Sequence, residues 1–364
     1  MSLPKRIRIK DIAVKAGVST GTVDRVLHDR GHVSPDAREK VLKVLEELNY
    51  QPNIIASTLA YNRILRLAAI IPAFEKDPFW QQPKQGIDLA LQAVQHYGIT
   101  LDFFTFDDSD TTDFDQKTRK VLTGKYDGVL LAPVLRVEGF LFMNELSHKG
   151  IPYVQINTFV PREDKACLCY VGQDSYQSGM LAAKLLNNSL QEGDAVAILH
   201  LEKKVINALH LQDKERGFSD YFAQENQRGL EILRFNFDSF EDGAKLNAFI
   251  TQILENHPRL RGIFLTTSRM YLIAPIFEAI KRSDVVLVGF DLVEQNLHYL
   301  NMGRIHFLIN QNPFKQGYLG ILNLFQHLIL KKPVNSEQFL PLDIVVPENL
   351  RYYLDEEVTL KTIV

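Results

Sequence analysis

Polar and aromatic side chains that could bind a small ligand follow several apolar segments of this 364-residue sequence. The segment DPFW at 77–80 sets Phe79 beside Trp80, and a sugar ring needs such flat apolar faces together with polar groups for its hydroxyls. The polar candidates all end or follow a predicted strand: Asp107, Asp108, Asn157, Asp174, Thr267, Asp291 and Gln311. Carboxylates accept hydrogen bonds from hydroxyls, which suits a neutral polyol. For any one residue, capping a turn is an equally good interpretation.

Motifs for catalysis are missing from the sequence. It contains no G-x-G-x-x-G after a strand, no G-x-x-x-x-G-K-[ST] and no H-E-x-x-H, and its G-x-S-x-G match, GVSTG at 17–21, does not follow a predicted strand. The ten histidines are scattered, and neither His200 nor His210 has a nucleophile or carboxylate pattern beside it that would favour a general base. Cys167 and Cys169 form a C-x-C pair without a histidine cluster, which favours buried strand residues over a metal site. We expect no enzymatic activity, no cofactor and no metal.

Positive charge is concentrated at the start of the chain. Residues 1–66 hold 12 Lys and Arg against 7 Asp and Glu, a net +5, whereas the remainder is net −8. A local basic surplus attracts phosphates, but it can also be a plain solvated face. The N-terminus lacks the apolar segment of a secretory signal, and no apolar run approaches the roughly 20 residues of a membrane span. We expect a cytoplasmic protein without a membrane partner.

Two short helices are predicted around the stretch GVSTGTVDRVLHDRG at 17–31. An apolar stripe from Ile9 to Ala16 stops at Gly17, whose missing side chain permits a positive φ and ends a helix. Ser19 precedes a second stripe over 23–27, and its hydroxyl can accept a hydrogen bond from the free amides of the opening turn. The second helix is therefore expected to start at Ser19.

A third helix is predicted from Ser34-Pro35 to about Asn49, because a capping residue is followed by the proline favoured at the first helical position. Its apolar stripe comprises Val41, Leu42, Leu45 and Leu48. Two helices joined by a glycine-containing turn and braced by a third predict a helix-turn-helix, whose second helix enters the major groove of DNA. A small helical module for protein contacts is the alternative.

The segment IKDIAVKAGVSTGTVDRVLHDRGHVSPDAREKVLKVLEELNYQPN closely resembles the DNA-binding headpiece of the lactose-repressor family of bacterial transcription regulators, over about fifty residues without a gap. The resemblance implies base-reading positions at Thr20, Gly21 and Arg25. It implies positions close to phosphates for Ser19, Thr22, Tyr50 and Asn53. Three departures from the family's usual sequence limit how far these residue roles can be carried over to this chain.

Asp24 stands where the family usually has serine, and a carboxylate near phosphates repels them unless a local cation offsets it. An intrahelical partner for Asp24 is the other interpretation. Gly21 offers no side chain to a base, so Arg25 carries more of the readout. The threonine that caps the family's first helix is replaced by Arg8, so that helix start is expected to be frayed or held by Asp11.

The segment PNIIASTLAYN at 52–62 is too short to hold a helix alone in water. In the family that it resembles, this hinge folds on the operator and inserts a leucine into the minor groove, which unstacks a base step and bends the duplex. Leu59 falls at that position, and packing of Leu59 against the next domain is the alternative.

From Leu65 onward, apolar strands alternate with amphipathic helices in two successive series, which predicts two α/β lobes with parallel sheets. Such sheets bind ligands beyond the carboxyl ends of their strands, so two facing lobes create a cleft. The layout resembles the type I periplasmic sugar-binding-protein fold that forms the effector domain of the same family. The resemblance implies ligand contacts at Asp291 and Gln311, and places Lys214 where the family usually has an arginine that binds bidentately.

We therefore expect an all-α helix-turn-helix headpiece at 1–51, a hinge at 52–63 and a two-lobed α/β effector and dimerisation domain at 64–364. The expected function is a sequence-specific transcriptional regulator, a repressor, with a homodimer on pseudo-palindromic double-stranded operator DNA and a small polar effector, a carbohydrate. A purine-like corepressor or a solute-binding receptor are the alternatives. The tail at 350–364 lacks the heptads of a coiled coil, so no zipper-type tetramer is expected.

Overall fold

A computed structural model of the chain describes residues 8–27, 31, 33–48, 64–203, 205–225 and 229–354. By its contacts the chain divides into two compact units, Met1–Asn62 and Arg63–Val364, and each is described by itself. The predicted hinge at 52–63 lies outside the described residues. No helix in the described ranges is long and apolar enough to cross a membrane.

The first unit contains three helices, α1 (Ile9–Ala16), α2 (Thr20–Leu27) and α3 (Pro35–Glu47). Gly17 ends α1 with a left-handed φ of 66°, as the sequence predicts. Asp11 holds the start of α1, because its carboxylate accepts a hydrogen bond of 2.9 Å from the Arg8 amide. The core is formed by Ile12, Val23 and Val41, which are fully buried.

The α3 stripe differs from the sequence prediction in one position. Leu42 is 51% exposed, whereas Val44 is buried, because the helix turns its 41–44–45–48 face inward and Leu42 lies about 100° away from Val41. Ser34 caps α3 as predicted, accepting a hydrogen bond from the Ala37 amide. The three helices thus enclose one small core, as a helix-turn-helix requires.

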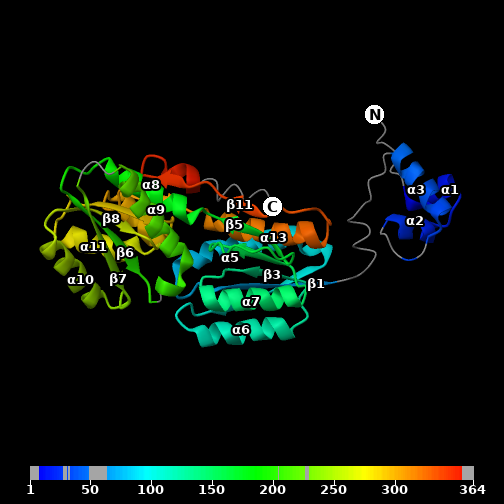
Figure 1. Cartoon of the computed structure of the whole chain (residues 1–364), viewed down its shortest axis with the longest axis horizontal. Helices are drawn as coiled ribbons and strands as arrows, with labels where there is room; N and C mark the ends of the chain where they lie inside the picture. Colours follow the sequence, from blue (N-terminus) through cyan, green and yellow to red (C-terminus); the bar gives the residue numbers. More distant parts are fainter. Residues whose placement is uncertain are drawn as a thin grey trace. The chain divides into compact units, whose positions relative to one another are not determined.

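The second unit consists of two α/β lobes (Figure 1). The N-terminal lobe has a sheet of order β11-β5-β4-β3-β1-β2 and the C-terminal lobe a sheet of order β12-β10-β9-β8-β6-β7. The strands of the first sheet are β1 (Leu65–Pro72), β2 (Ile99–Phe106), β3 (Gly128–Leu131), β4 (Tyr153–Ile156), β5 (Cys167–Gly172) and β11 (Glu337–Phe339). Those of the second are β6 (Ala195–Leu201), β7 (Glu231–Phe237), β8 (Leu260–Leu265), β9 (Val286–Phe290), β10 (Phe307–Asn310) and β12 (Asp343–Val345).

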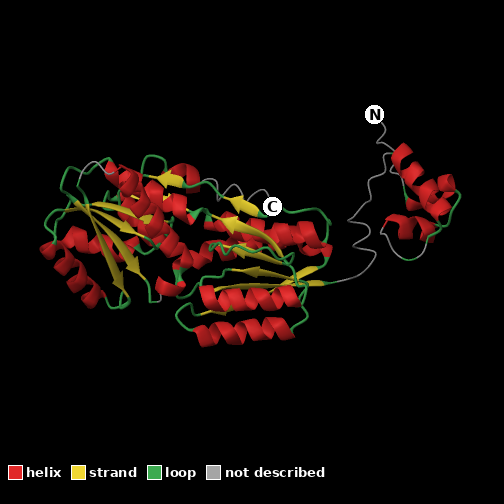
Figure 2. Ribbon diagram, in the orientation of Figure 1, coloured by secondary structure: helices red, strands yellow, loops and turns green. Residues whose placement is uncertain are grey.

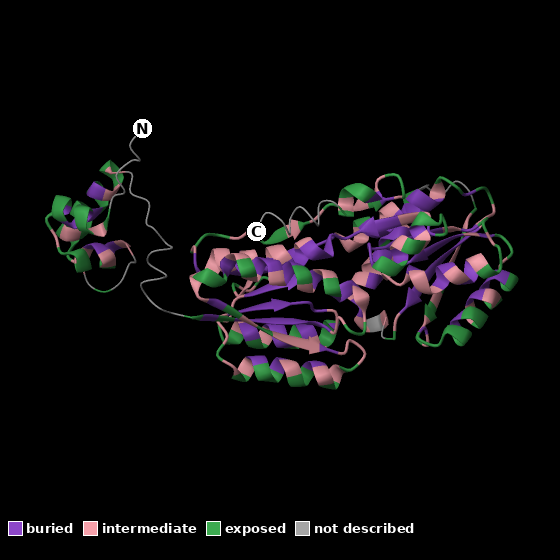
Figure 3. Cartoon of the chain, turned by 180° about the vertical axis from the view of Figure 1, so that it is seen from behind, coloured by how far each residue is buried: buried purple, intermediate pink, exposed green. Residues whose placement is uncertain are grey.

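The strand pairs are parallel except β10 with β12, which is antiparallel. The sequence analysis did not predict β11 and β12, whose three residues each are too few to show a pattern. Cys167 and Cys169 lie on β5 as free thiols, and Cys169 is buried, as expected. Figure 3 shows that the central strands of both sheets are mainly buried, whereas the edge strands β2 and β7 are only partly buried, and that exposed residues gather on the outer faces of the helices.

Helices cover both faces of each sheet (Figure 2). In the N-terminal lobe, α6 (Thr111–Thr123) and α7 (Arg136–His148) lie on one face, and α5 (Gln81–Val94) and α13 (Pro313–Leu328) on the other. The helices of the C-terminal lobe are α8 (Ser175–Asn187), α9 (Leu209–Glu225), α10 (Gly243–Asn256), α11 (Met270–Ala279) and α12 (Glu294–Asn301). Short 3₁₀ turns are η1 (Pro78–Trp80), η2 (Gln95–Tyr97) and η3 (Val205–Asn207). The chain passes between the lobes after β5, β10 and β11.

Paired glycines bring two helices of each lobe into backbone contact. A Cβ atom on Gly86 of α5 would lie 2.0 Å from the Phe314 carbonyl oxygen of α13, and one on Gly217 of α9 would lie 1.9 Å from the Tyr176 carbonyl oxygen of α8. No side chain fits at these distances, so glycine is required for the close approach. The contact between α8 and α9 fixes the position of Lys214, one turn before Gly217.

Candidate functional site

The first unit presents one polar face of α2 to solvent. Ser19, Thr20, Gly21 and Arg25 are exposed, whereas Val23 on the opposite side is buried against α1 and α3. Ser19 Oγ accepts a hydrogen bond of 3.1 Å from the Thr22 amide and lies 2.9 Å from the Thr22 hydroxyl. The predicted cap of the second helix is therefore present, and the remaining side chains of this face are available to a groove.

The second unit contains a partly open cavity of about 70 Å³ between its lobes. A buried water needs roughly 10–15 Å³ of such space, so the cavity has room for several waters or a small ligand. Its walls come from both lobes, at the carboxyl ends of the parallel strands. The lining residues are Asp77, Phe79, Trp80, Asp108, Val134, Leu135, Asn157, Glu202, Ala208, His210, Leu211, Lys214, Thr266, Thr267, Ser268, Arg269 and Gln311.

The aromatic wall of the cavity is built by the turn after β1. Asp77 Oδ1 accepts a hydrogen bond of 3.0 Å from the Phe79 amide and so caps η1, which turns Phe79 and Trp80 inward. Their rings meet edge to face, with centroids 5.0 Å apart, and both side chains are about 95% buried, with exposures of 5% and 4%. The sequence thus supplies a rigid apolar wall of the kind that packs against a sugar ring.

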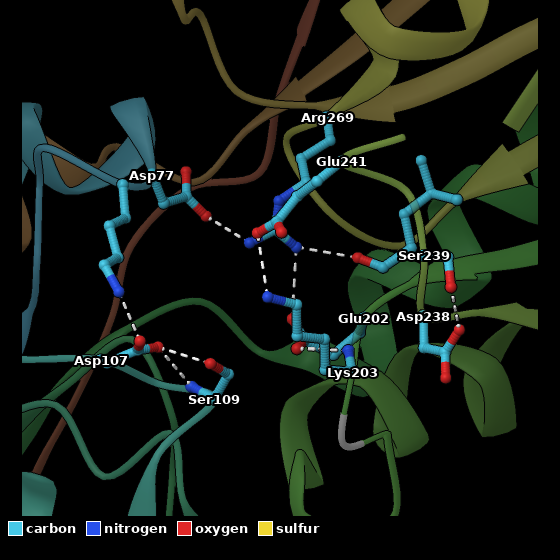
Figure 4. A network of polar contacts seen from close by, with 11 residues as sticks. Asp77, Asp107, Ser109, Glu202, Lys203, Asp238, Ser239, Glu241 and Arg269 are labelled. Carbon is cyan, nitrogen blue, oxygen red and sulfur yellow. Dashed lines mark hydrogen bonds and ion pairs between the residues drawn. The ribbon is translucent and has the colours of Figure 1, made fainter. Parts of the chain in front are cut away.

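Polar contacts hold the two lobes together around the cavity. Arg269 of the C-terminal lobe donates to Asp77 Oδ2 of the N-terminal lobe at 2.8 Å and to Glu202 Oε2 at 3.2 Å (Figure 4). Asn207 Nδ2 donates to Glu138 Oε2 at 2.8 Å, which ties the loop after β6 to α7. The structure therefore shows the cleft closed.

Two buried side chains of opposite charge, Lys214 and Asp291, lie at and behind the floor of the cavity. Lys214 is 2% exposed, donates to the Thr266 carbonyl oxygen at 3.0 Å and lies 3.5 Å from the centre of the Phe290 ring. Asp291 is fully buried and accepts hydrogen bonds from the Ser268 hydroxyl at 3.1 Å and from the Gln311 amide at 3.2 Å. Burial lowers the pKa of Lys214 and raises that of Asp291, and the charge of each partner opposes the shift of the other.

Two further side chains in the cavity have distinct electrostatic states. Burial lowers the pKa of His210 to about 3, so its ring is neutral and can share a hydrogen bond of 3.2 Å with the Thr158 hydroxyl of the other lobe. Thr267 Oγ1 is buried and has no hydrogen-bond partner within the described part of the chain. An unpartnered buried hydroxyl at a cavity wall is a ready partner for a ligand.

Family comparisons match both units. The model for bacterial regulatory proteins of the lacI family matches residues 8–53, and the model for the periplasmic binding protein domain matches residues 68–332. The chain belongs to the lacI family of bacterial regulatory proteins. This lacI-family regulator is a DNA-binding transcription regulator with a periplasmic-binding-protein-like effector domain, as the sequence analysis expected.

Relatives of this lacI-family regulator match nearly its whole length. The ribose operon repressor of Halalkalibacterium halodurans is 26% identical, over 94% of this chain and 97% of the relative. The sucrose operon repressor of Lactococcus lactis is 24% identical, over 96% of this chain and all of the relative. The crystal structure of a proposed LacI transcriptional regulator from Bacteroides fragilis superimposes with a TM-score of 0.72 at 28% identity, covering 80% of this chain and all of that one. The names of these relatives describe transcriptional regulators rather than enzymes.

Of the ten ligand residues that the sequence predicts for this lacI-family regulator, the structure brings seven to the cavity surface: Phe79, Trp80, Asp108, Asn157, Lys214, Thr267 and Gln311. Asp291 lies one layer behind, where it positions Gln311 and Ser268. Asp174 and Asp107 are not among the residues that line this cavity. Asp174 caps α8, accepting a hydrogen bond of 3.0 Å from the Gln177 amide. Asp107 pairs with Lys76 and caps the turn at Ser109, and these hydrogen bonds lower its pKa to about 2.

Sequence reasoning missed Glu202 and Arg269, which close the cavity. The available signal was their position directly after two predicted strands, the same signal that selected Thr267. Tyr50, Asn53 and Leu59 lie outside the described residues. Within those residues, no group of three or more His, Cys, Asp and Glu side chains is placed to hold a metal ion.

Proposed function

We propose that this lacI-family regulator is a repressor whose affinity for operator DNA is set by a sugar or sugar derivative bound between its lobes. The observation that carries the proposal is the cavity between the lobes, which joins an aromatic wall at Phe79 and Trp80 to polar groups from both lobes. Thr267 Oγ1 supplies a hydrogen-bond site that no described residue satisfies. The relatives' names point to the same ligand class, since they are repressors of ribose and sucrose operons.

On the DNA side, we propose that Thr20, Gly21 and Arg25 face the bases and that Ser19 and Thr22 lie close to phosphates. The exposure of Ser19, Thr20, Gly21 and Arg25 supports this assignment, and Thr22 is half-buried. Tyr50 and Asn53 are proposed as phosphate contacts and Leu59 as the minor-groove wedge. A homodimer places two headpieces in successive major grooves of a pseudo-palindromic operator, about one helical turn apart. Such a repressor acts where its operator is, in the bacterial cytoplasm.

Coupling between the two functions follows from closure of the cleft. A ligand that contacts both lobes stabilises the closed arrangement by its differential affinity for the closed and open states. The same coupling free energy must then appear in the effect of the ligand on DNA affinity, because linkage is reciprocal. Arg269 and Asp77, which join the lobes directly, set how much of the closure exists before the ligand binds.

The test combines a thermal-shift screen over sugars, sugar acids, sugar phosphates and purines with operator titrations. A ligand that binds only the folded protein raises its melting temperature. We expect Thr267→Val to weaken the shift without changing operator affinity, and Arg25→Ala to abolish discrimination between operator and random DNA without changing the shift. A purine that stabilises the protein while every sugar fails would refute the sugar assignment.

A further inference from the structure

Carboxylates outnumber cations on the wall that closes the cavity. Asp77 and Glu202 both bind the single guanidinium of Arg269, and the side chains of all three are less than one-fifth exposed. One positive charge therefore serves two negative charges at this point (Figure 4). The cluster formed by Asp77, Glu202 and Arg269 retains a net charge of −1.

Asp108 adds a further carboxylate to the same wall. It lines the cavity, it is partly buried, and none of the described residues donates a hydrogen bond to it. Burial is the main reason that its pKa is raised to about 6, and the charges of Glu202, Asp77 and Asp107 add to the rise while Arg269 opposes it. Asp107 is itself paired with Lys76, so that lysine does not compensate Asp108.

The cations elsewhere in the cavity are already engaged. Lys214 donates to the Thr266 carbonyl oxygen and lies against the Phe290 ring, and the opposite charge of Asp291, behind the cavity wall, offsets its own when both are ionised. His210 is neutral because its pKa is about 3. The cavity therefore has a net charge of −2 when Asp108 is ionised, and that excess is concentrated at the wall where Asp108 lies.

We infer that the effector of this regulator carries a positive charge as well as hydroxyls, as an amino sugar or another hydroxylated amine does. The inference rests on the proposed function and names its ligand class. The hydroxyls of a neutral ligand can donate hydrogen bonds to Asp108 in place of water, but they bring no counter-charge to the buried carboxylate. An ammonium supplies both the charge and the donors, and a phosphate or a sugar acid would add to the excess.

The remaining walls suit the rest of such a molecule. Thr267 Oγ1 is available to a ligand hydroxyl. Trp80 and Phe79 provide the apolar surface for a ring and the π-faces that attract a cation. One small molecule with an ammonium near Asp108 and hydroxyls toward Thr267 would satisfy every unpartnered group described above.

The experiment compares each amine with its own parent sugar on the full chain: glucosamine with glucose, galactosamine with galactose and mannosamine with mannose. Affinities are measured by calorimetry at about pH 7.5, where Asp108 is mainly ionised. We expect at least one amine to bind about tenfold or more tightly than its parent, as a charge-assisted hydrogen bond allows. Asp108→Asn should abolish that ratio, and Asp107→Asn, which removes the same charge one residue away but outside the cavity, should preserve it.

The pH dependence of binding distinguishes an ion pair between the ligand ammonium and Asp108 from a preference for the shape of the amine. Binding of an ammonium requires the ionised form of Asp108, so the affinity of the amine should fall about tenfold per pH unit below about 6 in the wild type and stay constant in Asp108→Asn. Parent sugars that bind as tightly as their amines in every pair would overturn the inference, as would an amine preference that survives Asp108→Asn. Failure of the proposed function would give a different result from failure of this inference, because operator affinity would then stay the same when a ligand binds.

Discussion

Replacing Lys214 with methionine tests the electrostatic interaction between the buried side chains of Lys214 and Asp291. The substitution keeps a long apolar stem against Phe290 and removes the charge that faces Asp291. Removing one partner of a buried ion pair costs about 3–5 kcal/mol, because the other charge is left uncompensated, and Lys214 and Asp291 interact without a direct ion-pair contact. Asp291 keeps its hydrogen bonds from Ser268 and Gln311, so we expect the lower part of that range at neutral pH.

Protonation of Asp291 sets an upper limit on this cost. The ordinary pKa of the carboxyl is 3.8, and its folded-state pKa is raised, so holding a proton in the folded state costs about 1.4 kcal/mol for each pH unit above 3.8. The ceiling is therefore about 4.4 kcal/mol at pH 7 and about 1.6 kcal/mol at pH 5. Because the ionised form is the disfavoured one, the destabilisation must shrink as the pH falls.

Urea unfolding at both pH values measures this difference, with Asp291→Asn as the matched background. We expect Lys214→Met to cost about 3–4 kcal/mol of unfolding free energy near pH 7 and less than about 2 kcal/mol near pH 5. In the Asp291→Asn background the same substitution should have a small and pH-independent effect. An equal loss at both pH values, or a double variant no more stable than Lys214→Met alone, would contradict the electrostatic reasoning.

Three other predictions concern separate parts of the molecule. Gly21→Ala should stabilise the headpiece by up to about 1 kcal/mol, since the new Cβ would meet only Ser19 Oγ, at 3.7 Å; a lower melting temperature would argue against a helical, open position. Arg269→Gln should reduce the unfolding free energy by about 2 kcal/mol, because Asp77 and Glu202 lose their shared partner. The same substitution should increase the radius of gyration in solution scattering, and an unchanged radius would show that other contacts keep the cleft closed. Leu59→Ala should weaken operator binding and bending while ligand binding stays the same, and equal bending in a gel-mobility assay would exclude the wedge.

The structural features that can be predicted from the sequence are those that recur along the chain, such as the alternation of strands and helices, and those that depend on a few neighbouring residues, such as helix ends. Gly17 and Ser34 act at helix ends through neighbouring backbone groups, so their effects are readable from a few residues. The alternation of strands and helices likewise identified two lobes. Leu42 was misplaced because several helical registers satisfy the same run of apolar residues, and packing against α1 and α2 selects one.

The candidate site was predicted in part for the same reason. Position after a strand selects residues near the cleft but does not say which way each side chain turns. Asp108 faces the cavity, whereas its neighbour Asp107 turns to Lys76 and Ser109. Asp174 satisfied the same rule and caps a helix instead. The pairing of Arg269 with Asp77 spans 192 positions of sequence, and no local pattern contains that information.

The glycine contact between α8 and α9 makes the floor of the cavity move together with the first segment that crosses between the lobes. The helix α8 begins at Ser175, just after the chain first passes between the lobes, and its backbone touches that of α9 at Gly179 and Gly217. Since α9 carries Lys214, any rotation at the first crossing must carry the ammonium with it rather than be absorbed by sliding helices. A small displacement of Lys214 by a ligand is therefore transmitted through α9 and α8 to the segment where the chain crosses between the lobes. The close backbone contact at Gly179 and Gly217 determines how much of that displacement is transmitted.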